Sequence, residues 1–94
     1  MTDYVNDYFT KNPGSLRKPL RTKRGDTLSV QASRGHYCSP RGDKGPYTAV
    51  EVWWSGNRCP RTLRPHQQKG DDGPLGWVPV ADVNLWIARR GGLA

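Results

Sequence analysis

The stretch YTAVEVWW, residues 47–54, alternates two kinds of side chain along its whole length. Successive side chains of an extended chain point to opposite faces, so the even-numbered residues from 48 to 54 share one face. This period of two predicts a β-strand whose Val50 and Val52 lie in the hydrophobic core. The opposite face is expected to expose a polar and aromatic platform of Tyr47, Glu51 and Trp53. In the alternative, Trp53 covers a small second cluster beneath the N-terminal segment.

Two further segments carry strand signals. DTLSVQAS, residues 26–33, alternates apolar side chains with hydroxyl-rich ones. LGWVPV, residues 75–80, contains Trp77 and a proline at position 79. Because proline has no N–H to donate to a neighbouring strand, Pro79 suits an edge strand or the end of a strand.

The residues after this third strand, ADVNLWIARRGG at 81–92, predict a C-terminal helix of about ten residues. Its apolar side chains recur at helical spacing and can pack on the sheet. Asp82 suits the first turn of a helix, and Arg89 and Arg90 suit the last, because the helix dipole is positive at its start and negative at its end. Gly91 favours the end of the helix, because glycine readily adopts the backbone conformation that follows a helix C-terminus.

These segments predict an α+β fold, a small antiparallel sheet of roughly three to five strands with one C-terminal helix. A chain of 94 residues supports one domain with a small core. We place that domain at residues 25–94 and interpret residues 1–24 as a basic N-terminal arm, because residues 11–24 hold six cations and no carboxylate. The short GWVPV step also resembles the closing strand of an SH3-like barrel, which makes such a barrel the alternative architecture.

Fifteen Lys and Arg residues against eight Asp and Glu residues give the chain a formal charge of +7. A second basic stretch, RCPRTLRPHQQK at 58–69, lies in a long segment without clear strand or helix signals, and such loops are often binding loops. Positive charge attracts phosphate-bearing partners, and the planar guanidinium group suits phosphate because it donates paired hydrogen bonds. The alternative is surface charge that only keeps the protein in solution.

The segment HYCSPR, residues 36–41, allows three interpretations. As an anion-binding loop, it has Pro40 to stiffen the turn and the following GDKGP to turn backbone N–H groups outward. As a catalytic site, it would need a Cys38 thiolate beside a base, and the sequence shows neither a nucleophile motif nor paired carboxylates. As a zinc site, it would combine two histidines and two cysteines whose spacings match no common zinc finger. Those four residues are His36, Cys38, Cys59 and His66.

The anion-binding interpretation is favoured, because aromatic rings beside the loop can stack on a base while arginines neutralise phosphates. The predicted ligand-binding residues are His36, Tyr37, Ser39, Arg41, Tyr47, Trp53, Arg58, Arg61, Arg64 and His66. The alternative is that these side chains only fix the turn. No catalytic residue, metal or cofactor is predicted.

A run of short motifs resembles a group of small proteins of unknown function found in phages and bacteria. The motifs are LSVQAS, HYCSPR, GPYTAVEV and GWVPV, followed by a final GG, and they span roughly residues 26–92. The resemblance implies a shared fold and a phage origin, and it supplies no activity or site. The chain departs from the group at Trp53 and Trp54, where a glycine usually follows the strand, and in its 58–75 loop, which is basic rather than acidic.

The expected function is that of a non-enzymatic, phage-encoded protein of the host cytoplasm that sequesters a phosphate-bearing ligand, in the leading version a host nucleotide signal. One alternative is an inhibitor that binds nucleic acid or a ribonucleoprotein defence complex, as an anti-CRISPR protein does. Another is a phage structural protein, and a homo-oligomer stays open. No membrane partner is expected, because the sequence shows no membrane-spanning stretch and no secretion signal. Cys38 and Cys59 are expected as thiols, with a disulfide as the alternative.

Overall fold

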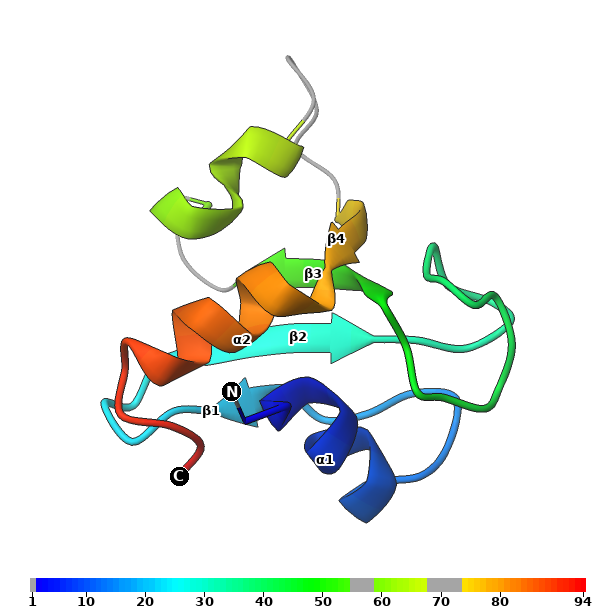
Figure 1. Cartoon of the computed structure of the whole chain (residues 1–94), viewed down its shortest axis with the longest axis horizontal. Coiled ribbons are helices and arrows are strands. Elements are labelled where there is room, and N and C mark those ends of the chain that lie inside the picture. Colours follow the sequence, from blue (N-terminus) through cyan, green and yellow to red (C-terminus); the bar gives the residue numbers. More distant parts are fainter. Residues whose placement is uncertain (1, 55–58, 68–73) are drawn as a thin grey trace.

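The computed structural model describes residues 2–54, 59–67 and 74–94, which fold into a four-stranded antiparallel sheet covered by helices (Figure 1). The strands are β1 (Leu20–Arg21), β2 (Thr27–Gln31), β3 (Ala49–Trp54) and β4 (Leu75–Pro79), side by side in that order. The helices of the described chain are α1 (Tyr4–Lys11), the 3-10 helix η1 (Arg61–His66) and α2 (Val80–Ala88). The α+β class and the C-terminal helix predicted from the sequence are confirmed.

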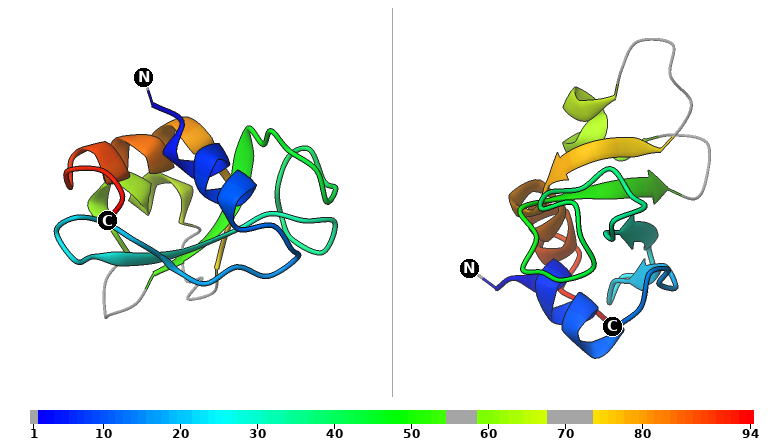
Figure 2. Two further views of the ribbon diagram at one scale, coloured as in Figure 1. Left: turned by 90° about the horizontal axis from the view of Figure 1, so that it is seen from below. Right: turned by 90° about the vertical axis from the view of Figure 1, so that its right-hand side faces the viewer.

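The core lies between one face of the sheet and the helices α1 and α2, which pack on the same side of it (Figure 2). Val30 of β2 pairs with Val52 of β3, and Val50 of β3 pairs with Val78 of β4, so the apolar faces of three strands are aligned. All four valine side chains are fully buried. The predicted position of the valine face in the core is therefore confirmed.

The C-terminal helix follows β4 without a loop. Pro79 ends the strand, and α2 begins at the next residue. Val83, Trp86 and Ile87 are buried against the sheet, as their helical spacing predicts. After the helix, Gly91 has a φ of +85°, a backbone conformation that glycine adopts without steric strain.

The last residues of the described chain return along β1. Leu93 forms an antiparallel bridge with Thr22, and the backbone N–H of Ala94 donates to the carbonyl of Arg21 at 2.9 Å. Backbone groups on the outer side of β1 are thereby paired.

The predicted N-terminal arm is instead part of the domain. Asp3 begins α1 as its N-cap, because its carboxylate accepts a hydrogen bond from the backbone N–H of Asn6. Val5 and Phe9, four residues apart on one face of this helix, are buried in the core. β1 then pairs with β2 as an edge strand. The boundary predicted at residue 24 therefore does not divide an arm from a domain.

A buried amide joins the two ends of the chain. The Asn84 Oδ1 atom on α2 accepts a hydrogen bond from the backbone N–H of Val5 at 3.0 Å. Its Nδ2 atom donates to Asp3 Oδ1 at 3.2 Å. Because Val5 N–H lies in the first turn of α1 and has no helical partner, Asn84 satisfies a donor that would otherwise be buried without one.

The cap at Asp3 predicts an acid-dependent stability. Partial burial by itself would raise the pKa of Asp3, but the hydrogen bonds from the Asn6 side chain, the Asn6 backbone and Asn84 outweigh it and hold that pKa below 3.8. The carboxylate therefore stabilises the fold above its unfolded-state pKa, and this contribution is lost as pH falls through the lower folded-state pKa. At pH 7, Asp3→Ala should lower the free energy of unfolding by about 1 kcal/mol.

Urea unfolding of Asp3→Ala and of the unchanged chain, at several pH values between 7 and 2, measures this effect. The difference in free energy of unfolding between Asp3→Ala and the unchanged chain should become smaller below pH 4. Asp7→Asn, which removes a carboxylate from the same helix, serves as the control and should change stability less. A gap that keeps its size at pH 2 would contradict the role of the Asp3 charge.

The alternative barrel architecture does not form. β1 and β4 lie at opposite edges of the sheet, so over the described strands the sheet is open rather than closed on itself. Within residues 2–54, 59–67 and 74–94, every helix is too short or too polar to cross a lipid bilayer.

Candidate functional site

Two half-exposed aromatic rings lie against each other on the sheet. Tyr37 comes from the loop between β2 and β3, and Trp77 comes from β4. Their ring centroids are 4.9 Å apart with an interplanar angle of 31°, and they keep 51% and 55% of their surface exposed. We call Tyr37 and Trp77 the aromatic pair.

The aromatic pair lies on the outer face of the sheet, the face turned away from α1 and α2. Glu51 alternates along β3 with the buried Val50 and Val52, so its side chain points to that outer face. The Glu51 carboxylate accepts a hydrogen bond from the backbone N–H of Tyr37 at 3.0 Å. Glu51 therefore fixes the loop end of the aromatic pair to the sheet.

The backbone holds the aromatic pair together as well. The backbone N–H of Trp77 donates to the carbonyl of Tyr37 at 3.0 Å. Gly76 lies so close that an added Cβ atom would be 3.0 Å from the Cβ atom of Tyr37, tighter than most contacts of real Cβ atoms, so Tyr37 would have to move by a few tenths of an ångström. A glycine at position 76 thus permits the close approach of the two segments.

Trp77 adopts an uncommon backbone conformation. Its φ is +50°, in the left-handed region that is costly for a bulky side chain, by about 1–3 kcal/mol. The β3–β4 register also shifts between Val50 and Val52, opposite this part of β4. The result is that Trp77 turns outward while Leu75, two residues earlier, is buried. Strain of this kind is concentrated at functional sites, which makes Trp77 the leading candidate residue.

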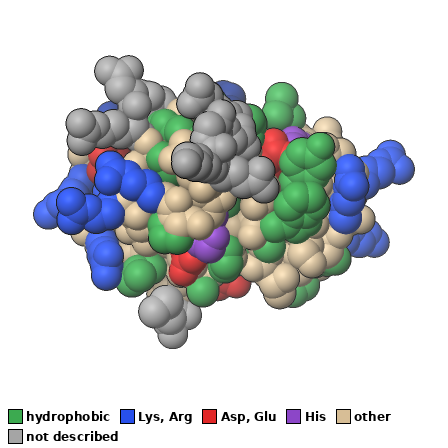
Figure 3. Space-filling model, turned by 90° about the horizontal axis from the view of Figure 1, so that it is seen from above, with side chains coloured by type: hydrophobic (Ala, Val, Ile, Leu, Met, Phe, Trp, Pro, Cys, Tyr) green, Lys and Arg blue, Asp and Glu red, His purple; other side chains and the backbone are tan. Residues whose placement is uncertain are grey.

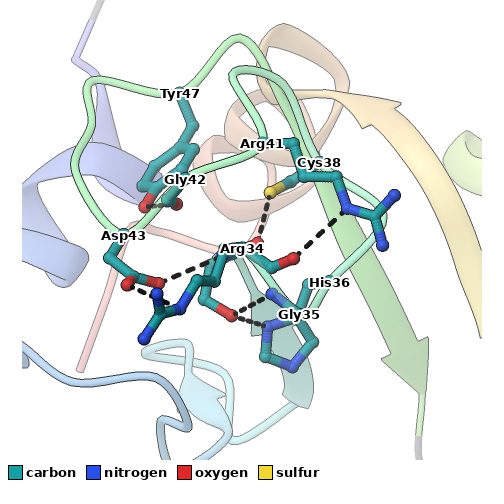
Figure 4. A network of polar contacts seen from close by, with 9 residues as sticks. Arg34, Gly35, His36, Cys38, Arg41, Gly42, Asp43 and Tyr47 are labelled. Carbon is teal, nitrogen blue, oxygen red and sulfur yellow. Dashed lines mark hydrogen bonds and ion pairs between the residues drawn. The ribbon is translucent and has the colours of Figure 1, made fainter.

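One arginine lies beside the aromatic pair, and a second lies in the same loop. The Arg41 guanidinium carbon lies 5.7 Å from the centroid of the Tyr37 ring. Arg41 Nε donates to the carbonyl of Arg34 at 3.2 Å, and Arg34 Nε forms an ion pair with Asp43 at 3.3 Å (Figure 4). The Arg34 side chain is 83% exposed, so its pairing with Asp43 is open to water and weak. The Arg34 guanidinium can therefore turn towards a negatively charged ligand, and the Arg41 guanidinium already lies beside the Tyr37 ring.

The remaining side chains of HYCSPR anchor the loop. The buried Cys38 thiol donates to the Ser33 carbonyl at 3.2 Å, and His36 Nδ1 lies 2.7 Å from Ser33 Oγ (Figure 4). The Ser39 carbonyl accepts from the backbone N–H of Thr48 at 2.8 Å. His36 is thus hydrogen-bonded through Nδ1 to a serine rather than to Cys38.

The four residues of the zinc interpretation are not gathered. Within the described residues, no three His, Cys, Asp or Glu side chains lie together as a metal site requires. Cys38 and Cys59 are both free thiols and both buried. Burial raises the pKa of the Cys59 thiol, against the opposing effect of the Arg64 charge.

The prediction that Tyr47 belongs to an exposed platform is wrong. Tyr47 is 3% exposed, packs edge-on against Phe9 of α1 at 5.5 Å, and donates from its hydroxyl to the Gly42 carbonyl at 2.8 Å. This burial raises the pKa of Tyr47. The reason is that β3 begins at Ala49, so the strand alternation does not extend back to position 47.

Trp53 takes the predicted position on the outer face. It is 43% exposed and stacks on Trp54 with a centroid distance of 4.9 Å. It follows Glu51 by two residues on β3, about 7 Å along the strand, where it pairs with Ser29 of β2. Pro19, from the segment assigned to the N-terminal arm, lines a small pocket together with Trp53 and Trp54, so Trp53 also borders that segment, as the alternative predicted, while it stays 43% exposed.

The arginines of the second basic stretch lie elsewhere. Arg61, Arg64 and His66 belong to η1, which Figure 1 shows above the sheet, away from the loop at its right that carries Arg41. Arg64 Nε donates to the Cys59 carbonyl at 3.0 Å, and His66 Nε2 lies 2.6 Å from Asp82 of α2. Figure 3 shows Lys and Arg side chains at two opposite ends of one face, with hydrophobic and histidine side chains between them. Arg58 lies outside the described residues.

The predicted ligand-binding residues therefore do not lie in one site. Trp77, the leading candidate residue, was not among those predicted from the sequence. Alternation in LGWVPV places Trp77 on the same side as the buried Leu75, so the pattern gives no reason to expect an exposed ring. The glycine before Trp77 was the available signal, because glycine inside a strand marks a bulge or a close approach of backbone.

No known protein family, curated protein or solved structure compared with this chain matches it.

Proposed function

We propose that this chain binds a phosphate-bearing ligand without catalysing a reaction, and that the ligand is single-stranded nucleic acid. The observation that supports this proposal is the aromatic pair, two half-exposed rings fixed to the outer face of the sheet by backbone hydrogen bonds. Trp53 offers a further ring along the same face. Successive bases can stack on such rings whatever their sequence.

The energetics favour stacking as the main contribution. The contact of large aromatic rings with water is unfavourable, and a stacked base removes part of it. Base stacking on an aromatic side chain contributes about 1–3 kcal/mol per base. Because Tyr37 and Trp77 are already ordered, a ligand need not restrict their rotamers, which lowers the entropic cost of binding.

Charge makes a smaller contribution near the aromatic pair. Arg34, Arg41 and Lys44 lie in the same loop as Asp43, and the Glu51 carboxylate is hydrogen-bonded to Tyr37. Three cations are therefore opposed by two carboxylates. The formal charge of +7 of the chain still attracts a polyanion from a distance.

The open geometry favours a polymer over a captured nucleotide. Rings that are about half exposed contact one side of a base, so affinity has to be summed over several nucleotides. Sequestration of a free host nucleotide by a phage protein is the second candidate, and it would require the ligand to be enclosed. An inhibitor of a nucleic-acid-containing defence complex remains compatible with the proposed function.

Fluorescence anisotropy with a labelled 12-nucleotide single strand tests the proposal. We expect micromolar binding that weakens with salt, log affinity falling by about 1.4 per tenfold increase if Arg34 and Arg41 neutralise one phosphate each, at about 0.7 per phosphate. Double-stranded DNA of the same length should bind more weakly, because its bases cannot stack on the rings. Mononucleotides should compete poorly.

A matched pair of variants tests the site itself. Tyr37→Ala should weaken binding of the single strand by about 5- to 150-fold, the equivalent of losing one stacked base. Leu16→Ala removes another exposed apolar side chain, 78% exposed and outside the site, and should bind as the unchanged chain does. Equal affinities for the two variants, or tighter binding of a mononucleotide than of the 12-nucleotide strand, would overturn the proposal.

A further inference from the structure

A separate pocket of about 480 Å³ lies between α1 and the segment 43–47. Asn6 of α1 joins its two walls, because its side chain donates to the Tyr47 carbonyl at 3.0 Å and accepts from the Tyr47 N–H at 2.8 Å. The two walls lie side by side in all three ribbon views (Figures 1 and 2). The volume falls within the range of pockets that hold small organic ligands.

Arg17 supplies a buried positive charge to this pocket. Its side chain lines the pocket, yet the residue keeps only 8% of its surface exposed. Its guanidinium carbon lies 4.1 Å from the centroid of the Phe9 ring. Nε donates to the Asn12 carbonyl and Nη1 to the Ala32 carbonyl, each at 2.8 Å. The backbone of Arg17 is fixed as well, because its N–H donates to Gln31 Oε1 and its carbonyl accepts from Gln31 Nε2.

This cation has no acidic partner. The ion pairs of the described residues join Arg34 to Asp43, His66 to Asp82 and Arg90 to Asp26, and none includes Arg17. A charge removed from water without a counter-charge is costly, even where carbonyl groups and a ring face compensate part of the cost. An anion in the pocket would supply the missing charge.

Donor groups of Arg17 remain available to such an anion. A guanidinium has five N–H donors, and the two hydrogen bonds above use one each, at Nε and Nη1. Among the described side chains, the one fully buried nitrogen or oxygen without a partner belongs to Trp86, not to Arg17. The Nη2 group is therefore not fully buried without a partner, and Arg17 is one of the residues that line the pocket.

We propose that this pocket binds a small organic anion. A carboxylate or phosphate group of the ligand pairs with Arg17, and an apolar or planar portion lies against Phe9, Pro13 and Pro46, which also line the pocket. Lys44 at the pocket adds a second positive charge, so Arg17 and Lys44 together outweigh the single Asp43 carboxylate that also lines it. The site is distinct from the aromatic pair and does not depend on the proposed function.

Nuclear magnetic resonance of the ¹⁵N-labelled full chain tests the site with benzoate, phenyl phosphate and inorganic phosphate as probes. Benzoate or phenyl phosphate should shift the amide signals of Thr10, Gly14 and Gly45 and the Arg17 Nε–H signal, with saturation at millimolar concentration. Benzyl alcohol, which has the ring without the charge, should leave them in place, as should chloride at equal ionic strength. The indole signal of Trp77 should not move. Comparing the probes tells which anionic group the pocket prefers.

Two variants locate the binding. Arg17→Met keeps the length and apolar stem of the side chain without its charge, and should weaken probe binding at least tenfold. Thr10→Trp places a large side chain at an exposed α1 position on the pocket wall, and should block binding without removing a core contact. Arg24→Gln makes the same charge change at an exposed position elsewhere and should bind as before.

Three results would overturn the proposal. The first is the absence of saturable shifts with every anionic probe at 20 mM. The second is shifts at Trp77 in place of Gly14 and Gly45. The third is unchanged probe affinity in Thr10→Trp, a variant that decides the question even if Arg17→Met fails to fold.

Discussion

A chain shortened to residues 25–94 should not fold. It lacks Val5, Phe9 and Leu20, which are at most 5% exposed in the structure. Burying side chains of this size contributes about 1.5–3 kcal/mol each, roughly 5–9 kcal/mol for the three. Small domains have total unfolding free energies of about 5–15 kcal/mol, so the loss is comparable to the whole. Far-ultraviolet circular dichroism and a thermal melt of the shortened chain measure the outcome.

The same argument applies to one side chain. Phe9→Ala should lower the free energy of unfolding by about 3–5 kcal/mol, because it removes contacts with both Tyr47 and Arg17. Leu16→Ala, at a position 78% exposed, should change it by less than about 0.5 kcal/mol. A cooperative melting transition of the 25–94 chain near that of the full chain would show that the N-terminal segment is dispensable after all.

Replacing Trp77 by glycine should separate binding from stability. Glycine adopts a φ of +50° without steric strain, so Trp77→Gly relieves about 1–3 kcal/mol stored in the backbone. It also removes a ring that is 55% exposed and contributes limited burial. We expect the free energy of unfolding to stay the same or rise, while the affinity for the 12-nucleotide strand falls about 5- to 150-fold.

Urea unfolding and anisotropy on the same samples measure the two effects. Trp77→Phe is the control, because it keeps both a ring for stacking and the left-handed backbone, and it should retain most of the affinity. If Trp77→Gly binds the single strand as tightly as the unchanged chain, stacking on this ring is not the basis of recognition. If it unfolds far more readily, the ring serves the fold rather than a ligand.

The sequence was sufficient for β2 and β3, because apolar and polar side chains alternate along most of their length, whereas β1 lies in the segment interpreted as an arm. Val50 and Val52 could be assigned to the core from their spacing alone, and Pro79 marked the end of an edge strand. The C-terminal helix was equally readable, since its apolar residues, Asp82 in its first turn and Gly91 agree with one another, although the helix ends at Ala88, before Arg89 and Arg90. Where local signals agree in this way, tertiary contacts rarely change the outcome.

The sequence was insufficient where one or two contacts decide the structure. α1 has only Val5 and Phe9 as buried residues, too few to stand out from a basic, proline-containing segment. The direction of Trp77 depends on a single dihedral angle and on the space left by Gly76. The buried position of Tyr47 depends on Phe9, thirty-eight positions earlier in the sequence, which no local pattern reveals.

The pairing of the C-terminal residues with β1 affects how copies of this protein meet in solution. Open strand edges recruit strands from other molecules and so lead to aggregation. Here Leu93 and Ala94 occupy the outer side of β1, and the Tyr37 carbonyl takes the Trp77 N–H that β4 would otherwise offer. The β1 border of the sheet is thus covered by a segment of the same chain, which disfavours edge-to-edge polymerisation there.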